Sequence, residues 1–203
     1  MQLDHLAVTC ADLDAGSAYT EAALGVPLQP GGQHARYSTH NRLLSLGPGE
    51  YLEVIAPDCA APRPRHPVWF GLGQATIPRL GNWIVRVPDL AKALETATPG
   101  AGESVALERG DLKWRIAVPP DGSLPLDGAY PTLIEWQGTA LHPSARLTDR
   151  GIRLTGLDIS HPDAADLTAT VALALSDPRI RFHPGPLALC ATFSTPHGPR
   201  KLG

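Results

Sequence analysis

The sequence predicts an α+β protein of two successive units, each running strand, helix and three strands, followed by a C-terminal half-unit. Three observations predict this class. Short runs of Val, Ile and Leu recur between tight turns, which the 20 glycines and 21 prolines supply. A strand followed by a helix cap occurs near residue 5 and again near residue 82. A third strand and helix follow after residue 150.

The first unit opens with a strand at residues 3–9, LDHLAVT, and a helix that starts after Asp12. Asp12 can accept a hydrogen bond from the first free helical N–H groups, and Gly25 allows the left-handed conformation that ends a helix. After the turn-rich stretch GGQHARYSTH, residues 41–46 and 51–56 are short strands joined by a Gly-Pro-Gly turn. A further strand among these middle elements is the least defined.

The second unit repeats this order. Asp89 lies 77 residues after Asp12, and the same offset places Asn82 at the position of His5. The unit continues through LKWRIAV to YPTLIEW, which ends at residue 136. A third, shorter copy begins with LTGLDISHPD, continues as a helix and includes a strand at 187–193.

We therefore expect one domain of two units and an appended half-unit. The expected boundaries are 1–145 for the domain, about 1–57 and 80–138 for its two units, 57–67 for a Pro-rich linker, and 146–203 for the half-unit. A half-unit cannot bury the apolar stripe of its own helix, so it should pack on the preceding units of the same chain.

Composition excludes several classes of partner. The net charge is −3 and the 17 Lys and Arg residues are scattered, which argues against nucleic acid. Apolar runs are shorter than the roughly 20 residues of a membrane span, and the N-terminus has no leader pattern. The three cysteines form no CxxC pair, which favours a reducing cytoplasm. A small molecule is the expected partner.

Several motifs resemble the glyoxalase-like branch of the vicinal oxygen chelate superfamily over nearly the whole chain. They are the paired units, the Asp-His of the first strand, THN at 39–41, YLEVIAP at 51–57 and IEWQGTALHPS at 134–144. The resemblance implies sheets curled into a cup, with a divalent metal held by one residue from the first strand and one from the last strand of each unit. It leaves the reaction open, because the superfamily contains isomerases, lyases, dioxygenases, resistance enzymes and metal-free binding proteins. It also leaves open a homodimer.

Strand alternation supplies candidate metal ligands. It places His5, Glu53 and Glu135 on faces that the cup could share. A carboxylate inside an apolar strand is costly to bury without a partner, and imidazole with carboxylates suits Zn, Fe, Mn, Ni or Co. Asn82 would occupy the fourth position, where it is a weak ligand for softer metals. A satisfied core histidine, solvent-facing glutamates and a cup without metal remain alternatives.

Other polar residues are candidates for catalysis and substrate binding. His40 or His142 could reach the cup mouth as a general acid or base, or could simply satisfy loop backbone groups. Asn41 follows in the THN motif as a substrate-binding candidate. Arg86 and Arg115 are expected to face inward, where each would bind a substrate carboxylate or pair with a glutamate.

Two functional hypotheses follow. The first is a metal-assisted lyase, isomerase or dioxygenase that acts on a small oxygenated, anionic organic molecule, with the metal as Lewis acid. The second is a metal-free protein of the same fold that binds or sequesters a small molecule.

Overall fold

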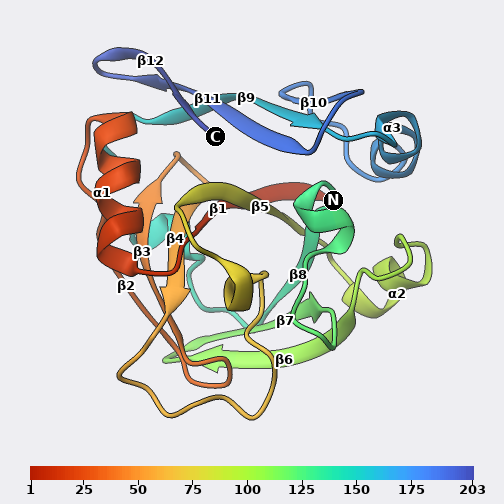
Figure 1. Cartoon of the computed structure of the whole chain (residues 1–203), viewed down its shortest axis with the longest axis horizontal. Helices are drawn as coiled ribbons and strands as arrows, with labels where there is room; N and C mark the ends of the chain where they lie inside the picture. Colours follow the sequence, from red (N-terminus) through yellow and green to blue (C-terminus); the bar gives the residue numbers. More distant parts are fainter.

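The chain forms two sheets that lie one above the other, as the computed structural model in Figure 1 shows. The structure describes residues 1–203, apart from the side chain of Ala172. Eight strands form the larger sheet in the order β2-β3-β4-β1-β5-β8-β7-β6, and four form the smaller sheet in the order β10-β9-β11-β12. No helix in the described part of the chain is long and apolar enough to cross a membrane.

The elements follow the expected order. The first unit contains β1 (Gln2–Thr9), α1 (Leu13–Leu24), β2 (Gln29–His34), β3 (Thr39–Ser45) and β4 (Tyr51–Pro57). The second contains β5 (Arg79–Arg86), α2 (Leu90–Glu95), β6 (Glu103–Arg109), β7 (Leu112–Val118) and β8 (Thr132–Gln137). The C-terminal part contains β9 (Arg153–Ser160), α3 (Ala164–Ala172), β10 (Ile180–His183), β11 (Ala188–Thr195) and β12 (Gly198–Leu202). Three short 3-10 helices are η1 (Leu72–Gln74), η2 (Pro125–Gly128) and η3 (Pro143–Arg146).

The two units are joined through their first strands. β1 and β5 pair antiparallel at the centre of the sheet, β1 pairs in parallel with β4, and β5 pairs in parallel with β8. The second unit therefore repeats the strand order of the first from the sheet centre outward. The predicted α+β fold of paired strand–helix–three-strand units is confirmed.

Local chemistry defines the helix ends. The side chain of Asp12 accepts the N–H of Ala15 at 2.8 Å, and α1 ends at Gly25, which has φ 74°. Asp89 caps α2 in the same way by accepting the N–H of Lys92 at 3.0 Å. These caps agree with the sequence prediction. The second helix is only 6 residues long, so it covers little of its sheet.

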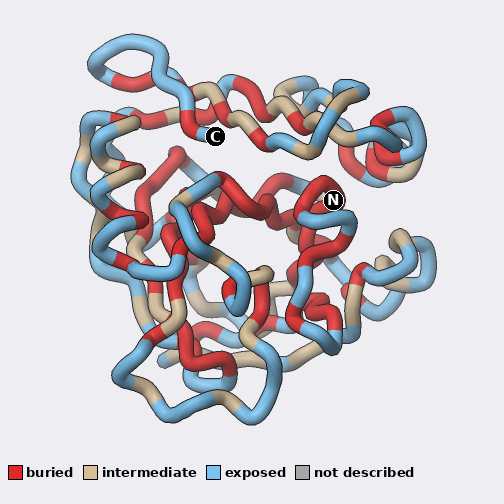
Figure 2. Tube along the Cα trace, in the orientation of Figure 1, coloured by how far each residue is buried: buried red, intermediate tan, exposed pale blue. Residues whose placement is uncertain are grey.

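The large sheet curls until its two edge strands, β2 and β6, contact each other. Its inner face carries a buried apolar cluster. The segment between the two units enters this interior, because Trp69, Phe70 and Leu72 are buried in the same cluster, and η1 lies inside the curled sheet in Figure 1. Figure 2 shows that most residues of the central strands are buried. The Pro-rich linker thus continues into a plug that fills part of the cup.

The C-terminal sheet packs on the outer face of the large sheet. Leu157, Ile159 and Phe193 share a buried cluster with Leu6 and Trp83 of the central strands. Two strands here, β10 and β12, were not expected from the sequence. In the first unit, β2 is one of the three strands expected after the helix, and it is the one whose position the sequence left undefined. The internal order also differs from the first unit, because β9 pairs in parallel with the strand that directly follows its helix.

Candidate functional site

A β-bulge at the start of β1 places two ionisable residues side by side in the cup. Leu3 pairs with Val85 and His5 pairs with Ile84, so Asp4 has no opposite residue in β5. An extra residue of this kind bends the strand and turns a side chain toward a new face. The bulge therefore explains how neighbours in a strand reach the same polar cluster.

Asp4 is the centre of that cluster. Its carboxylate is fully buried and accepts His5 Nδ1 at 2.7 Å, Trp136 Nε1 at 2.9 Å and His142 Nε2 at 3.0 Å. Arg86 Nε lies 3.7 Å away. Burial alone would raise the pKa of Asp4, but the hydrogen bonds from His142 and His5 hold it well below its ordinary value. Asp4 is therefore ionised at neutral pH.

His5 presents its second ring nitrogen to the cup. Its Nε2 lies 3.5 Å from Glu53 Oε2, and its ring stacks on Tyr51 with centroids 4.3 Å apart. Burial lowers the pKa of His5, but Asp4 and Glu53 outweigh burial and raise it above its ordinary value of 6.5. The imidazolium form is thus stabilised between two carboxylates.

Glu53 faces His5 from β4. Its Oε1 accepts Asn41 Nδ2 at 2.5 Å, and the side chain is almost fully buried. Burial alone would raise the pKa of Glu53, but the hydrogen bond and charge of His5 lower it to about 2. The cup therefore holds an imidazolium and a carboxylate in contact, away from bulk water.

A second histidine lies on the opposite wall in neutral form. Burial lowers the pKa of His34 to about 4. Its Nε2 lies 3.3 Å from the Arg109 guanidinium and its Nδ1 lies 3.1 Å from Thr39 Oγ1, which fits a proton on Nδ1. Arg109 also approaches Asn41 Oδ1 at 3.5 Å, so it connects this wall to Glu53.

The free space beside these groups is small. A cavity of about 30 Å³ is lined by polar and aromatic side chains, among them His5, Glu53, Tyr51 and Trp136. Trp69 and Phe70 of the plug form its apolar side. This volume holds water or a very small ligand group. A larger ligand would need the plug to move.

The second unit places uncharged residues at the positions of His5 and Glu53. Ala7 pairs with Glu53 in the first unit, and the equivalent Ile84 pairs with Thr132 in the second. Asn82 and Thr132 are buried, and Asn82 Nδ2 donates to Thr132 Oγ1 at 3.0 Å. The register thus identifies Thr132, not Glu135, as the counterpart of Glu53.

Glu135 does not face the cup, so its expected place among the metal ligands is wrong. Its Oε2 accepts the N–H of Leu90 at 2.8 Å, at the start of α2 on the outer face. The flanking residues Ile134 and Trp136 line the cup instead. An offset of three residues from Thr132 reverses the face of a strand residue, which explains the error.

Two other candidates also lie outside the cup. His40 alternates with Asn41 on β3 and shares the outer face with Arg42, which bonds Asp14 of α1. Arg115 is exposed, while its neighbours on β7 are buried in the cup. The expected roles of His40 as acid or base in the cup and of Arg115 as an inward anion ligand are therefore wrong.

Three candidates lie in or beside the cup. Asn41 bonds Glu53, and His142 reaches the site through Asp4, as described above. Arg86 is half-buried and donates to the backbone oxygen of Gly49 at 2.7 Å. The Arg86 guanidinium is thus hydrogen-bonded to the protein backbone and lies beside Asp4. The sequence analysis did not select Asp4 as a site residue. The signal was present, because Asp4 is an acid inside an apolar strand, which is the pattern that selected Glu53.

These side chains do not fit a divalent metal held by four protein ligands. Within the described residues, no three His, Cys, Asp or Glu side chains gather in a metal-binding arrangement. The Asn82 oxygen already accepts the N–H of Trp83 at 2.9 Å, and its nitrogen donates to Thr132. Of the four expected ligands, only His5 and Glu53 face the cup with groups that commonly bind divalent metals, and both are already hydrogen-bonded to protein groups.

Comparison with known proteins assigns the family. Residues 3–175 match the glyoxalase-like domain family, and the chain belongs to that family. A hypothetical protein from Staphylococcus aureus has the same fold, with a TM-score of 0.61, 13% identity, and coverage of 92% of this chain and 87% of that chain. The Mn(II)-bound glyoxalase from Novosphingobium aromaticivorans shares the fold at a TM-score of 0.51 and 12% identity, covering 98% of this chain and 80% of that chain. No curated protein matches the sequence.

Proposed function

We propose that the chain is an acid–base enzyme of the isomerase or lyase type that acts on a small carbonyl compound without a metal. The observation that supports this most strongly is the buried row of Asp4, His5 and Glu53, with contacts of 2.7 Å and 3.5 Å. An imidazolium and a carboxylate that face one cavity are the two groups needed to move a proton between carbon and oxygen.

Each group has a distinct role in this proposal. Glu53 accepts a proton from the carbon next to the substrate carbonyl. The electron pair of the broken C–H bond forms the carbon–carbon double bond of the enol. His5 donates its Nε2 proton to the carbonyl oxygen at the same time. Return of the oxygen-bound proton to His5, with delivery of a proton to the opposite face of the same carbon, completes an epimerisation and restores the enzyme. The two carboxylates beside His5 keep its acid form present near neutral pH.

The surrounding residues position these two groups. Asp4 fixes the orientation of the His5 ring through Nδ1. Asn41 fixes Glu53 by donating to one oxygen, which leaves the oxygen nearest His5 for the substrate proton. Arg109, which contacts both Asn41 and His34, supplies positive charge for an anionic substrate group at the cavity wall. A keto acid with a short carbon chain fits these requirements.

A binding role without turnover is the second candidate. The observation that favours it is the small cavity of about 30 Å³, because the plug residues occupy much of the cup. In that case His5 and Glu53 would hydrogen-bond a ligand without exchanging its protons. The two candidates are distinguished by whether carbon-bound protons exchange.

Solvent exchange at carbon tests the proposal. Protein pre-treated with a chelator would be incubated in D₂O with a panel of short keto acids and aldehydes, and deuterium incorporation followed by NMR. We expect the wild type to exchange carbon-bound protons in the presence of chelator. We expect the exchange rate to fall by about 10²- to 10⁴-fold in Glu53→Gln and His5→Gln. His40→Gln, which changes an outer-face histidine, is the matched control and should keep the wild-type rate. Binding without exchange would support the second candidate, and exchange only with added metal would overturn the metal-free mechanism.

A further inference from the structure

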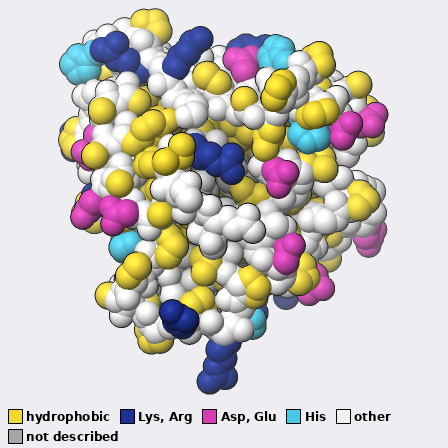
Figure 3. All heavy atoms as spheres, viewed as in Figure 1, with side chains coloured by type: hydrophobic (Ala, Val, Ile, Leu, Met, Phe, Trp, Pro, Cys, Tyr) yellow, Lys and Arg dark blue, Asp and Glu magenta, His cyan; other side chains and the backbone are white. Residues whose placement is uncertain are grey.

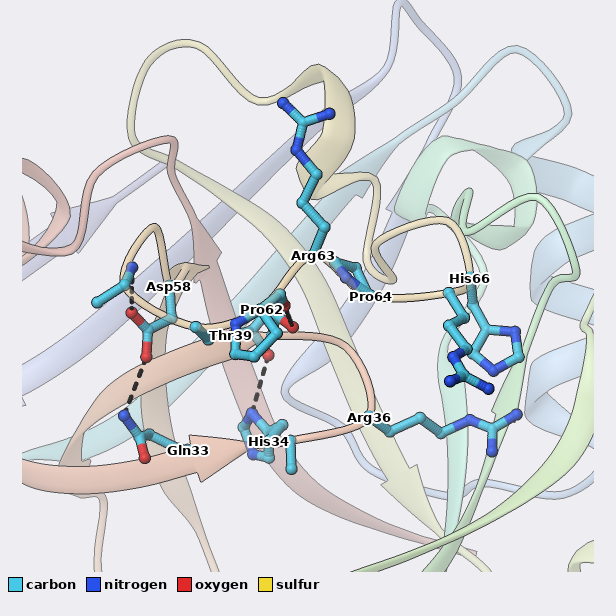
Figure 4. Close-up of a pocket in the computed structure, with 14 residues that line it drawn as sticks. Gln33, His34, Arg36, Thr39, Asp58, Pro62, Arg63, Pro64 and His66 are labelled. Atoms are coloured by element: carbon cyan, nitrogen blue, oxygen red, sulfur yellow. Dashed lines mark hydrogen bonds between the residues drawn. The ribbon is translucent and has the colours of Figure 1, made fainter.

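A cavity of about 570 Å³ lies outside the cup, between the β2–β3 turn and the loop at residues 58–66. Figure 4 shows this cavity with the turn on one side and the Pro-rich loop on the other. Its volume is in the range of sites that hold small organic molecules. Only His34 is shared with the small cavity beside His5, so the two are separate spaces.

The cavity gathers unpaired positive charge. Arg36, Arg63 and Arg65 line it, and none of them has a carboxylate within ion-pair distance among the described residues. Elsewhere in the described part of the chain, Arg42, Arg146, Arg153, Arg179 and Arg181 each have a carboxylate partner, whereas other arginines such as Arg150 have none. All three side chains are exposed at the cavity, so their guanidinium groups are free to form charge-assisted hydrogen bonds with a bound anion.

The one acid in the cavity does not neutralise these arginines. Asp58 Oδ2 accepts Gln33 Nε2 at 2.9 Å, and its Oδ1 accepts the N–H of Ala60 at 3.0 Å, as the dashed lines in Figure 4 show. Both carboxylate oxygens of Asp58 therefore accept hydrogen bonds from neighbouring protein groups and not from the arginines. Positive charge remains in excess, and Figure 3 shows Lys and Arg atoms at the lower edge of the molecule, where these loops lie.

The walls of the cavity are held in place. Ser38 Oγ donates to the backbone oxygen of Pro62 at 2.5 Å, and the N–H of Asp58 donates to the backbone oxygen of Ser38 at 2.8 Å. The Arg36 guanidinium carbon lies 5.8 Å from the ring centre of Tyr37, which itself stacks on Trp69. Prolines restrict the loop further, so fewer conformations are lost when a ligand binds.

The distribution of side chains indicates the kind of ligand. In Figure 4, Arg36 and His66 point toward one end of the cavity from opposite walls, while Arg63 extends away from them. Alanine and proline side chains form much of the remaining lining. We propose that this cavity binds the oxyanion group, phosphate or carboxylate, of a small organic molecule that has an apolar body. Guanidinium groups match both oxyanions by paired hydrogen bonds.

Binding measurements with defined probes test this site independently of any activity in the cup. Calorimetric titrations would use phenyl phosphate, phenylacetate and inorganic phosphate on wild type, Arg36→Met, Arg65→Met and the double variant. Arg150→Met, which changes an exposed arginine far along the chain, is the matched control. We expect a phenyl probe to bind more tightly than inorganic phosphate, at least tenfold weaker binding in each single variant, and no change in the control.

The two phenyl probes distinguish the oxyanions. Preference for phenyl phosphate would assign a phosphate ligand, and preference for phenylacetate would assign a carboxylate. Binding that Arg36→Met and Arg65→Met leave unchanged would overturn the site, and so would the absence of binding by all three probes. Thermal unfolding of each variant would show that any loss does not come from misfolding.

Discussion

Asn82 and Thr132 are hydrogen-bonded to each other at the positions that His5 and Glu53 occupy in the first unit. The two halves of the cup thus share a backbone arrangement but differ in chemistry. One half holds an ionised pair and the other a neutral pair whose polar atoms bond to each other and to the backbone. The second half therefore offers neither the imidazole nor the carboxylate that a divalent metal commonly binds, and the metal-free mechanism that we propose rests on this asymmetry.

Restoring the missing ligands should create a metal site. We expect the double substitution Asn82→His with Thr132→Glu to bind one Mn²⁺ or Zn²⁺ per chain, since it places imidazole and carboxylate in both halves. Without metal the new buried charge should destabilise the protein. Saturating metal should then stabilise the variant by about 2.7 kcal/mol at a hundredfold excess over Kd.

Elemental analysis and thermal unfolding with and without metal provide the measurement. The wild type is the control and should show neither bound metal nor a shift in melting temperature. Tight metal binding by the wild type would show that His5 and Glu53 suffice and would contradict the interpretation of the asymmetry.

Glu135 should contribute to stability and not to chemistry. Its carboxylate accepts the N–H of Leu90 at the start of α2, as an N-terminal cap does. We expect Glu135→Ala to lower the free energy of unfolding by about 0.5–2 kcal/mol, measured by urea denaturation. Deuterium exchange in the proposed reaction should be unchanged. If Glu135→Ala lost most of the deuterium exchange but kept normal stability, Glu135 would have a role in the reaction, contrary to this prediction.

The prediction from sequence succeeded where the signal was local. Asp12 and Gly25 mark the ends of a helix through their own chemistry, and the repeat offset aligned Asn82 with His5 correctly. Alternation also separated the two faces of each strand. It could not tell which face lines the cup, because the plug makes the inner face as apolar as the outer one.

The remaining errors have a common physical origin in register. The bulge at Asp4 adds a residue that no alternation pattern shows, and it brings a second acid into the cup. The closing strand of the second unit is displaced by two residues from the simple repeat, so Thr132 takes the place of the expected carboxylate. The pairing between strands that are distant in the sequence determines these positions. That pairing is visible in the folded structure and not in the pattern of residues along one strand.

The ionised pair in the cup should give a defined pH dependence of stability. The pKa of Glu53 is lowered from 4.5 to about 2, so its stabilising contribution is complete above pH 4.5 and is lost as the pH falls toward 2. The pKa of His5 is raised above 6.5, so its contribution is complete below that pH and is lost as the pH rises past the raised value.

Urea unfolding of wild type and Glu53→Gln across this pH range measures the effect. We expect the difference in unfolding free energy between the two proteins to shrink as the pH falls from about 4.5 to 2, because only the wild type can lose this carboxylate by protonation. Acids that both proteins share cancel in the difference. A difference that stays constant over this range would show that Glu53 is not held ionised by His5.

His142 should act as a route for protons between solvent and His5. Its side chain is 17% exposed and its Nε2 lies 3.0 Å from the Asp4 oxygen that is not bonded to His5. Loss of this donor in His142→Ala should cost about 1–3 kcal/mol of stability, since a buried carboxylate loses a hydrogen bond. We also expect slower deuterium exchange that free imidazole in the buffer partly restores, because small imidazole can occupy the vacated space beside Asp4.

His161→Ala, at a histidine distant in sequence and outside the cup, should show neither the loss nor the rescue. If His142→Ala slowed exchange but imidazole at any concentration had no effect, His142 would be assigned a purely structural role in holding Asp4.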